Sequence, residues 1–222
     1  MKKIIAIVAL LSTLIFSANI SKEVFKVKTA SGKELIFKGT DEGIITSPYE
    51  GKIVFLEFWG TWCGPCLLSI PHHVKLQDKY KNDLRIVAIE TTPKVTAKEL
   101  LNYKTNASKA IDMSKVQWFL DNKAKDPRAK AYLKTPVNEL EEFVKSGKNI
   151  NYDLVASKDA GNFLYYITKR AQWQGGIPFL IIFDKQGRVA DVIQGMPSED
   201  RLLANIKRIL NKEKNSDNNK TK

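Results

Sequence analysis

The pentapeptide Trp-Cys-Gly-Pro-Cys at residues 62–66 constrains this chain most, because it contains both of the protein's cysteines. The apolar run 53–58 before it is typical of a buried strand, and residues 67–80 after it are expected to form a helix. Cys63 would then lie where unpaired N–H groups and the helix dipole stabilise a thiolate. Cys66 would lie one turn away and could close a disulfide with it. The spacing predicts a two-electron thiol–disulfide centre.

Two simpler explanations of the cysteine pair are weak. A structural zinc site needs four ligands, and His72 and His73 are the only histidines in the chain. Adjacent helix residues point about 100° apart, so these two histidines would make a poor clamp, and we expect both to be solvated and to bind no metal. A structural disulfide that closes so short a loop would remove little entropy from the unfolded chain.

The first 18 residues resemble an export signal. Lys2 and Lys3 form a basic start, residues 4–16 are apolar, and Ala18 offers a small-residue cleavage site. The apolar run is too short for a comfortable membrane-spanning helix. Phe16 stands where a small residue is preferred, so an uncleaved anchor also remains open. We expect a periplasmic protein, either soluble after cleavage or anchored by its first segment, in an oxidising compartment.

At 222 residues the chain fits one domain with an insertion, which we place at 19–210. From Asn211 the sequence is polar and without periodicity, so residues 211–222 are expected to be a disordered tail. Ser198 is expected to cap the last helix. Hydrophobic patterning and turn residues predict a hairpin, strands and further helices at 25–28 with 34–37, 84–89, 138–146, 152–156, 160–171, and 177–183 with 188–193.

Residues 92–136 form a basic insertion. They contain ten Lys and Arg residues and four acidic ones, a net charge of +6 in a chain whose total is +12. Short apolar stretches predict helices packed on the edge of the domain. The charge is explained by a solvated face, or by a docking surface for an acidic partner or an anionic membrane. No phosphate-binding pattern is present, and we expect no nucleic-acid partner.

Three segments together resemble the thioredoxin superfamily: residues 58–66, Pro71, and Gly176-Ile177-Pro178. Within it the chain is most similar to the exported or membrane-tethered reductases of the TlpA/ResA type. The resemblance covers about residues 25–210, interrupted by the insertion. It implies an α/β thioredoxin fold, in which helices flank a central mixed sheet, with an N-terminal β-hairpin and the helical insertion added.

The resemblance also implies a role for each matching residue. Cys63 would be the exposed nucleophile that attacks a disulfide, and Cys66 would resolve the mixed disulfide. Pro178 would be a cis proline facing the cysteines, and the backbone of Ile177 would pair with substrate like an added strand. The expected substrate-binding residues are Trp62, Gly64, Pro65, Gly176 and Ile177.

Two positions depart from the family pattern. Ser69 stands where TlpA/ResA-like proteins usually have glutamate, and Glu57 stands where that branch often has asparagine and thioredoxin has a buried aspartate. Ile89 replaces the lysine that accompanies this aspartate, so no cation is evident near Glu57. Burial favours the protonated form of a carboxyl. Glu57 is therefore suited to accept the proton of Cys66, unless it is simply hydrated at a strand end.

The Gly64-Pro65 dipeptide and Ile177 before the proline are thioredoxin-like and favour a reductase. The resemblance implies a membrane thiol-electron transporter (DsbD/CcdA-like) as electron donor. It also implies disulfide-containing exported clients, with apocytochrome c as one example. No cofactor besides the redox-active disulfide is expected, and no dimerisation domain is visible, so we expect a monomer. A disulfide oxidase or isomerase, and a redox-tuned binding module, are the alternatives.

Overall fold

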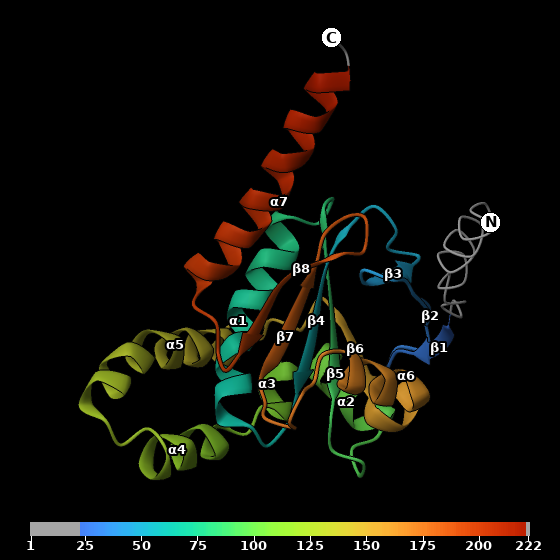
Figure 1. Ribbon diagram of the computed structural model, residues 1–222. Coiled ribbons are helices and arrows are strands. Elements are labelled where there is room, and N and C mark those ends of the chain that lie inside the picture. Colours follow the sequence, from blue (N-terminus) through green and yellow to red (C-terminus); the bar gives the residue numbers. More distant parts are fainter. Residues whose placement is uncertain (1–22, 221–222) are drawn as a thin grey trace, which may run out of the picture.

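The strand β4 (Ile53–Trp59) lies at the centre of the fold, and every one of its residues is buried. The computed structural model describes residues 23–220 (Figure 1). β4 pairs in parallel with β5 (Leu84–Glu90) and antiparallel with β7 (Phe179–Phe183). β6 (Asp153–Ala156) and β8 (Val189–Gln194) complete a mixed sheet of order β6-β5-β4-β7-β8. A strand buried on both faces explains the uninterrupted apolar pattern that marks β4 in the sequence.

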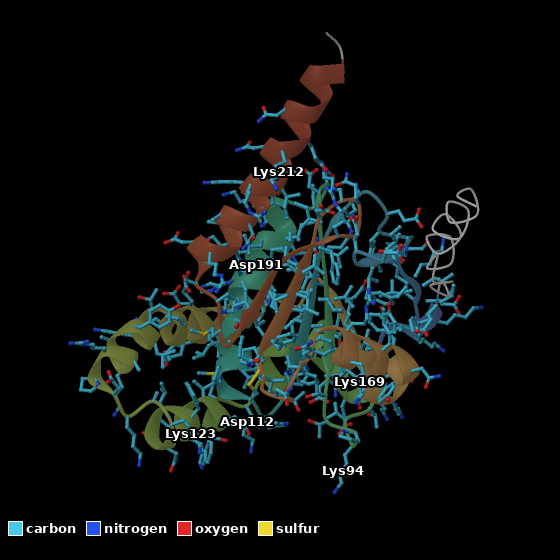
Figure 2. All side chains as sticks on the ribbon, viewed as in Figure 1. Lys94, Asp112, Lys123, Lys169, Asp191 and Lys212 are labelled. Atoms are coloured by element: carbon cyan, nitrogen blue, oxygen red, sulfur yellow. A yellow bond between two sulfur atoms is a disulfide. The ribbon has the colours of Figure 1, made fainter. Side chains whose placement is uncertain are left out.

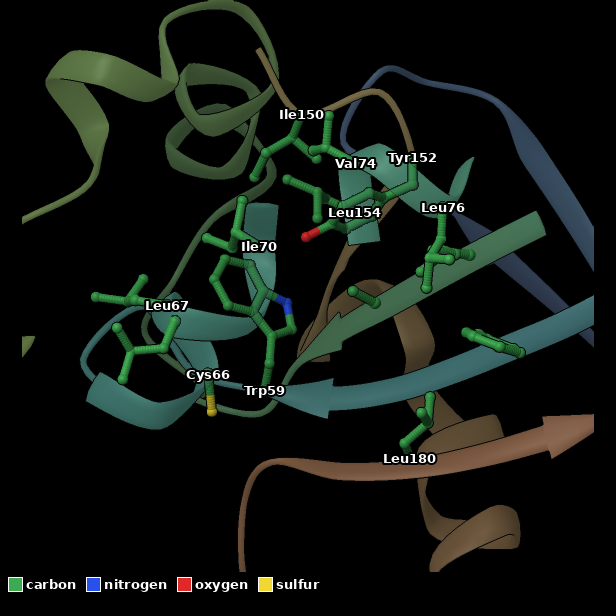
Figure 3. Packing of buried hydrophobic residues seen from close by; sticks show 14 of the residues in the cluster. Trp59, Cys66, Leu67, Ile70, Val74, Leu76, Ile150, Tyr152, Leu154 and Leu180 are labelled. Carbon is green, nitrogen blue, oxygen red and sulfur yellow. The ribbon is translucent and has the colours of Figure 1, made fainter. Parts of the chain in front are cut away.

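Helices cover both faces of this sheet, as in a thioredoxin fold, so the predicted fold class is confirmed. Ile53, Phe55 and Trp59 of β4 belong to a cluster that contains residues of α1 and α7. Figure 3 shows Trp59 beside Ile70 of α1. The alternate residues Val54 and Phe58 face α6. The helices are α1 (Gly64–Lys79), α2 (Ala97–Thr105), α3 (Ala107–Ala110), α4 (Met113–Asn122), α5 (Pro127–Lys145), α6 (Ser157–Arg170) and α7 (Glu199–Lys220).

The predicted N-terminal hairpin is present as β1 (Val24–Lys28) and β2 (Glu34–Gly39). A third strand, β3 (Ile44–Ser47), pairs with β2 and makes a three-stranded antiparallel sheet. Only four residues long, β3 gives a weak sequence signal. The backbone N–H of Ile44 donates to the C=O of Gly187, in the turn between β7 and β8, at 2.7 Å. The small sheet is thereby tied to the central one.

The basic insertion is helical, as its apolar stretches predict. It contains α2, α3, α4 and the first half of α5. α5 begins at Pro127, earlier than the helix expected from 138, and passes through Pro136. Asp126 explains this start, because its carboxylate accepts hydrogen bonds from the N–H groups of Arg128 and Ala129. Proline at the first helical position is also favourable, since no N–H partner is lost there.

The C-terminal helix differs from the expected disordered tail. α7 continues to Lys220, well past Asn211. Glu213 explains the first added turn, because its carboxylate lies 2.8 Å from Nζ of Lys185 in the β7–β8 turn. Nearer its start, α7 is held to β8 by Arg201, whose guanidinium donates to both carboxylate oxygens of Asp191. Asp191 is labelled in Figure 2. The end of a helix is predicted from the periodicity of its apolar residues. Charged contacts such as these lie outside that periodicity, so the sequence did not predict the longer helix.

The expected export signal at 1–18 lies outside the described residues. Within residues 23–220, no helix is both long enough and apolar enough to span a bilayer.

Candidate active site

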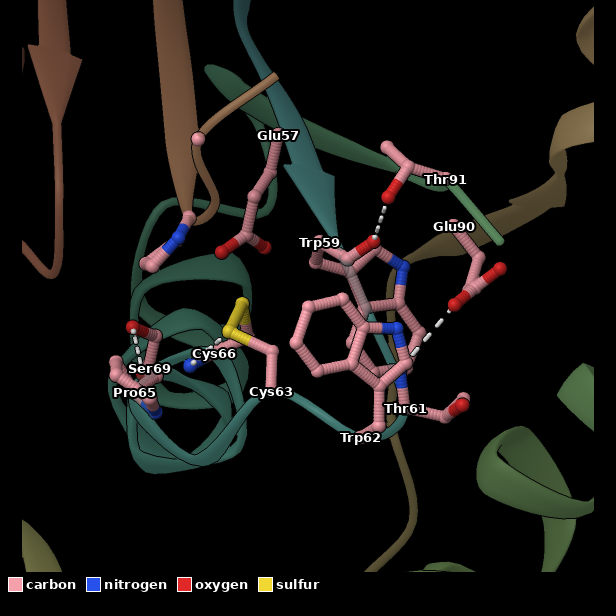
Figure 4. Close-up of a disulfide and its surroundings, with 12 residues drawn as sticks. Glu57, Trp59, Thr61, Trp62, Cys63, Pro65, Cys66, Ser69, Glu90 and Thr91 are labelled. Carbon is pink, nitrogen blue, oxygen red and sulfur yellow. Dashed lines mark hydrogen bonds between the residues drawn. A yellow bond between two sulfur atoms is a disulfide. The ribbon is translucent and has the colours of Figure 1, made fainter. Parts of the chain in front are cut away.

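Cys63 and Cys66 form a disulfide at the start of α1 (Figure 4). Cys63 is the N-cap residue, and its Sγ accepts a hydrogen bond from the backbone N–H of Cys66 at 3.3 Å. In the reduced protein the same N–H and the helix dipole would stabilise a Cys63 thiolate. The strand–Cys-x-x-Cys–helix arrangement predicted from the sequence is therefore present.

Cys63 is less accessible than the resemblance implies. It is only 5% exposed, and Cys66 is fully covered. The helix α4 packs against α1 and reaches its first turn, next to Cys63 in the chain. A Cβ placed on Gly64 would lie 2.6 Å from Cβ of Phe119. The insertion thus reaches the Cys-x-x-Cys segment, which spacing in the sequence did not reveal.

This close approach leads to a prediction for Gly64→Ala. In an open helix the change would stabilise by about 1 kcal/mol through propensity. Here the clash with Phe119 should prevail, and we expect a loss of about 1–3 kcal/mol in unfolding free energy, measured by urea denaturation. The matched control is the same change in a Phe119→Gly background, which removes the Cβ and ring that clash, so the loss there should be clearly smaller. An equal loss in both backgrounds would show that the Phe119 side chain does not restrict this position.

The loop before β7 lies against the Cys-x-x-Cys segment. The Ile177–Pro178 bond is cis. Cδ1 of Ile177 approaches Gly60, where an added Cβ would be 3.0 Å away. Among the described residues, neither the N–H nor the C=O of Ile177 has a hydrogen-bond partner. Both backbone groups just before β7 are thus open to a peptide that adds as a strand.

Hydrogen bonds from neighbouring residues hold this loop, while side chains near the disulfide stay exposed to solvent. The C=O of Gly176 accepts hydrogen bonds from Nε1 of Trp173 at 2.7 Å and from Nε2 of Gln194 at 3.1 Å. Trp62 is 56% exposed, while its Nε1 donates to Oγ1 of Thr92 at 2.9 Å. Pro65 is half-buried, and its C=O accepts from Oγ of Ser69. Gly64 is covered by α4, so of the predicted substrate-binding residues it is the one whose access is restricted. The binding role of the others stays a prediction.

Glu90 is a buried acidic residue that sequence analysis did not identify. It ends β5 directly opposite Trp59, the last residue of β4. Its carboxylate accepts hydrogen bonds from the N–H of Thr61 at 3.3 Å (Figure 4) and from the N–H of Thr92 at 2.7 Å. Burial raises the pKa of Glu90, and these hydrogen bonds oppose the shift. Glu90 thus ties together the two loops that carry Trp62 and its partner Thr92. An acidic residue at the end of an apolar, buried strand was the sequence signal that could have identified Glu90.

Glu57 is buried below the disulfide and is not hydrated at a strand end. Its side chain is directed towards the Cys63–Cys66 bond (Figure 4). A basic side chain that sequence analysis did not place there lies beside it, because Nδ1 of His73 is 3.1 Å from its Oε2. His73 is seven residues after Cys66, which is two helical turns, so both side chains lie on the face of α1 that meets the sheet. That spacing was the missed signal.

The expectation that the two histidines are solvated is also wrong. His73 is covered by the sheet, and His72 is buried against α5, where its Nε2 contacts a carboxylate oxygen of Glu139. A ring nitrogen of His72 and one carboxylate oxygen each of Glu139 and Glu199 lie within 4.8 Å of one another. Glu199 is already paired with Nζ of Lys75 at 2.8 Å.

Residues 42–114, which include β4, the cysteines and β5, match the family model described as Thioredoxin. This match covers about a third of the chain. Among curated proteins, the chain is 37% identical over 68 residues to the thioredoxin-like protein YneN of Bacillus subtilis, covering 31% of this chain and 35% of YneN. It is 40% identical over 63 residues to the thiol-disulfide oxidoreductase ResA of Halalkalibacterium halodurans, covering 28% of this chain and 36% of ResA.

The chain thus matches about a third of the length of these relatives. The predicted resemblance to ResA-type proteins is confirmed in this segment. Among solved structures, a thiol:disulfide interchange protein DsbE from Chlorobium tepidum matches with a TM-score of 0.47 and 18% identity, covering 85% of this chain and 94% of that chain. StoA from Bacillus subtilis matches with a TM-score of 0.42 and 16% identity, covering 82% and 94%.

Proposed function

We propose that this protein is a thiol–disulfide oxidoreductase that reduces disulfides in other proteins. The observation that carries the proposal is the Cys63–Cys66 disulfide at a helix N-terminus beside the unpaired backbone of Ile177. The cysteine pair can exchange two electrons with a disulfide, and the backbone of Ile177 can bind the peptide that carries that disulfide. The ResA relatives, named thiol-disulfide oxidoreductases, support this chemistry.

The reaction takes place in two exchanges. The Cys63 thiolate attacks one sulfur of the client disulfide, forms a mixed disulfide and releases the other client sulfur as a thiolate. Cys66 loses its proton and attacks Sγ of Cys63, which forms the Cys63–Cys66 bond and releases the second client thiolate. The protein dithiol is oxidised by two electrons and the client is reduced by two. Glu57 is the proposed acceptor of the Cys66 proton.

The direction of electron flow is proposed from the dipeptide between the cysteines. Gly64-Pro65 adds no side-chain donor that would stabilise a thiolate further, and a less stabilised thiolate makes a more reducing pair. In the exported location proposed from residues 1–18, the oxidised pair would need re-reduction by a membrane thiol-electron transporter. Exported disulfide proteins, including apocytochrome c, are the proposed clients.

Two measurements test the function and its direction. Catalytic reduction of insulin in the presence of a small-thiol donor is expected, and its absence would favour a redox-tuned binding module. The reduction potential of the pair, measured against a glutathione series, is expected near thioredoxin's value of about −270 mV. A value near −120 mV, that of a strong periplasmic oxidant, would instead identify a disulfide oxidase.

A further inference from the structure

Glu57 and His73 form a buried ionisable pair in the layer between the sheet and α1. Their side chains are 4% and 1% exposed, and Nδ1 of His73 lies 3.1 Å from Oε2 of Glu57. The ring is not oriented for a hydrogen bond to that oxygen, and neither ring nitrogen has a hydrogen-bond partner among the described residues. An unsatisfied buried polar group destabilises the folded state, so stability does not account for an imidazole at this position.

The surroundings leave His73 as the cationic partner available to Glu57. Across β4, Glu57 is in register with Ala88 of β5 and Leu180 of β7, both apolar. Within residues 23–220, no Lys or Arg forms an ion pair with Glu57. The other titratable group nearby is Tyr152, whose ring meets that of His73 edge-on at 6.0 Å. Burial and the charge of Glu57 both raise the pKa of Tyr152 well above its usual value, so its hydroxyl stays neutral.

We propose that His73 is a positioning residue whose positive charge keeps Glu57 in its carboxylate form beneath Cys66, ready to accept the thiol proton. An opposite charge within about 4–6 Å favours the ionised form of a carboxyl, whereas burial alone favours the protonated form. Only the ionised form can take a proton from Cys66. The inference rests on the proposed thiol–disulfide exchange and concerns its second step.

In that step a negative charge moves from Glu57 to the sulfur of Cys66, while the charge of His73 does not change. The proton of Cys66 passes to a carboxylate oxygen of Glu57, and the negative charge passes from the carboxylate to the sulfur. The sulfur then forms the bond to Sγ of Cys63, and the client sulfur leaves with the electron pair of the broken bond and takes a proton from water. Glu57 afterwards releases its proton to solvent. The imidazolium remains charged throughout and stabilises whichever neighbour is negative.

The test is the pH dependence of the rate at which Cys66 releases a model client from its mixed disulfide with Cys63. For His73→Gln we expect the rising limb of the profile to move up by roughly one to three pH units, so that the rate at pH values on that limb falls by up to about tenfold for each unit of the shift. Glu57→Gln should slow the step about 10²-fold and flatten the profile. Adding His73→Gln to Glu57→Gln should change nothing more, because His73 acts through Glu57.

The matched control is His72→Gln. It removes the neighbouring buried histidine, whose ring contacts Glu139 and not Glu57. This variant should retain the wild-type profile. An unshifted profile in His73→Gln, or an equal shift in His72→Gln, would overturn the inference. A wild-type protein that forms no mixed disulfide and reduces no client would refute the proposed function instead.

A second measurement does not require the His73 variant to fold. With two histidines in the chain, nitrogen-15 NMR of the wild-type protein should resolve two imidazoles, and spectra of His72→Gln assign them. We expect the His73 ring of the oxidised protein to carry protons on both nitrogens at neutral pH. A neutral His73 ring under these conditions would contradict the proposed counter-charge.

Discussion

Cys66→Ser is expected to convert the protein from a catalyst into a trap for its clients. Cys63 keeps its position at the helix N-terminus and can still attack a disulfide, but no second thiol is present to release the product. Insulin turnover should cease, and a covalent complex with about one client per protein molecule should accumulate. Non-reducing electrophoresis followed by mass spectrometry of the linked peptides measures this outcome.

The variant Cys63→Ser is the control for client capture by Cys66→Ser. With Cys66 covered by the helix and the sheet, this variant should neither turn over insulin nor capture a client. Capture by Cys63→Ser as strongly as by Cys66→Ser would show that the buried sulfur is reachable. The assignment of attacking and resolving cysteines would then be reversed.

Phe163→Ala is expected to have the largest effect on stability. Phe163 lies on α6 and is fully buried. Its ring stacks on Phe37 of β2 with centroids 4.0 Å apart, and contacts Phe25 of β1 at 5.6 Å. It therefore joins the N-terminal sheet to the rest of the domain. Removing such a ring leaves a cavity that costs about 3–5 kcal/mol in unfolding free energy.

Urea denaturation measures this loss, and Tyr165→Ala on the same helix is the control. Tyr165 is 68% exposed and has only Lys169 over its ring, so its loss should cost less than about 1 kcal/mol. Equal effects of the two variants would mean that α6 is destabilised as a helix, independently of the packing on Phe37. Against a typical total stability of about 5–15 kcal/mol, the expected difference is large.

Glu90 shows how the site is supported from outside the matching motif. Its carboxylate binds the backbone of Thr61, before the cysteines, and of Thr92, at the start of the insertion. Oγ1 of Thr92 in turn accepts from the indole of Trp62. This network uses groups separated by about thirty residues in the chain, and hydrogen bonds hold the exposed indole next to the disulfide.

The amino-acid sequence alone determined the central chemistry and most of the framework. A strand, two cysteines separated by two residues, and a helix are linked within a short segment, so local backbone geometry forces the sulfurs together at a helix N-terminus. The hairpin at β1 and β2 and the strands β4, β5 and β7 also follow from patterns that each segment carries within itself.

The tertiary structure decided which side chains meet. Whether Glu57 has a partner depends on how α1 is rotated against β4, and that rotation buries His73 under the sheet while His72 turns to α5. The contact of Phe119 with Gly64 likewise depends on where α4 packs. Such pairings join residues from separate elements, and their distances are set by packing of the whole core, which no local pattern in the sequence specifies.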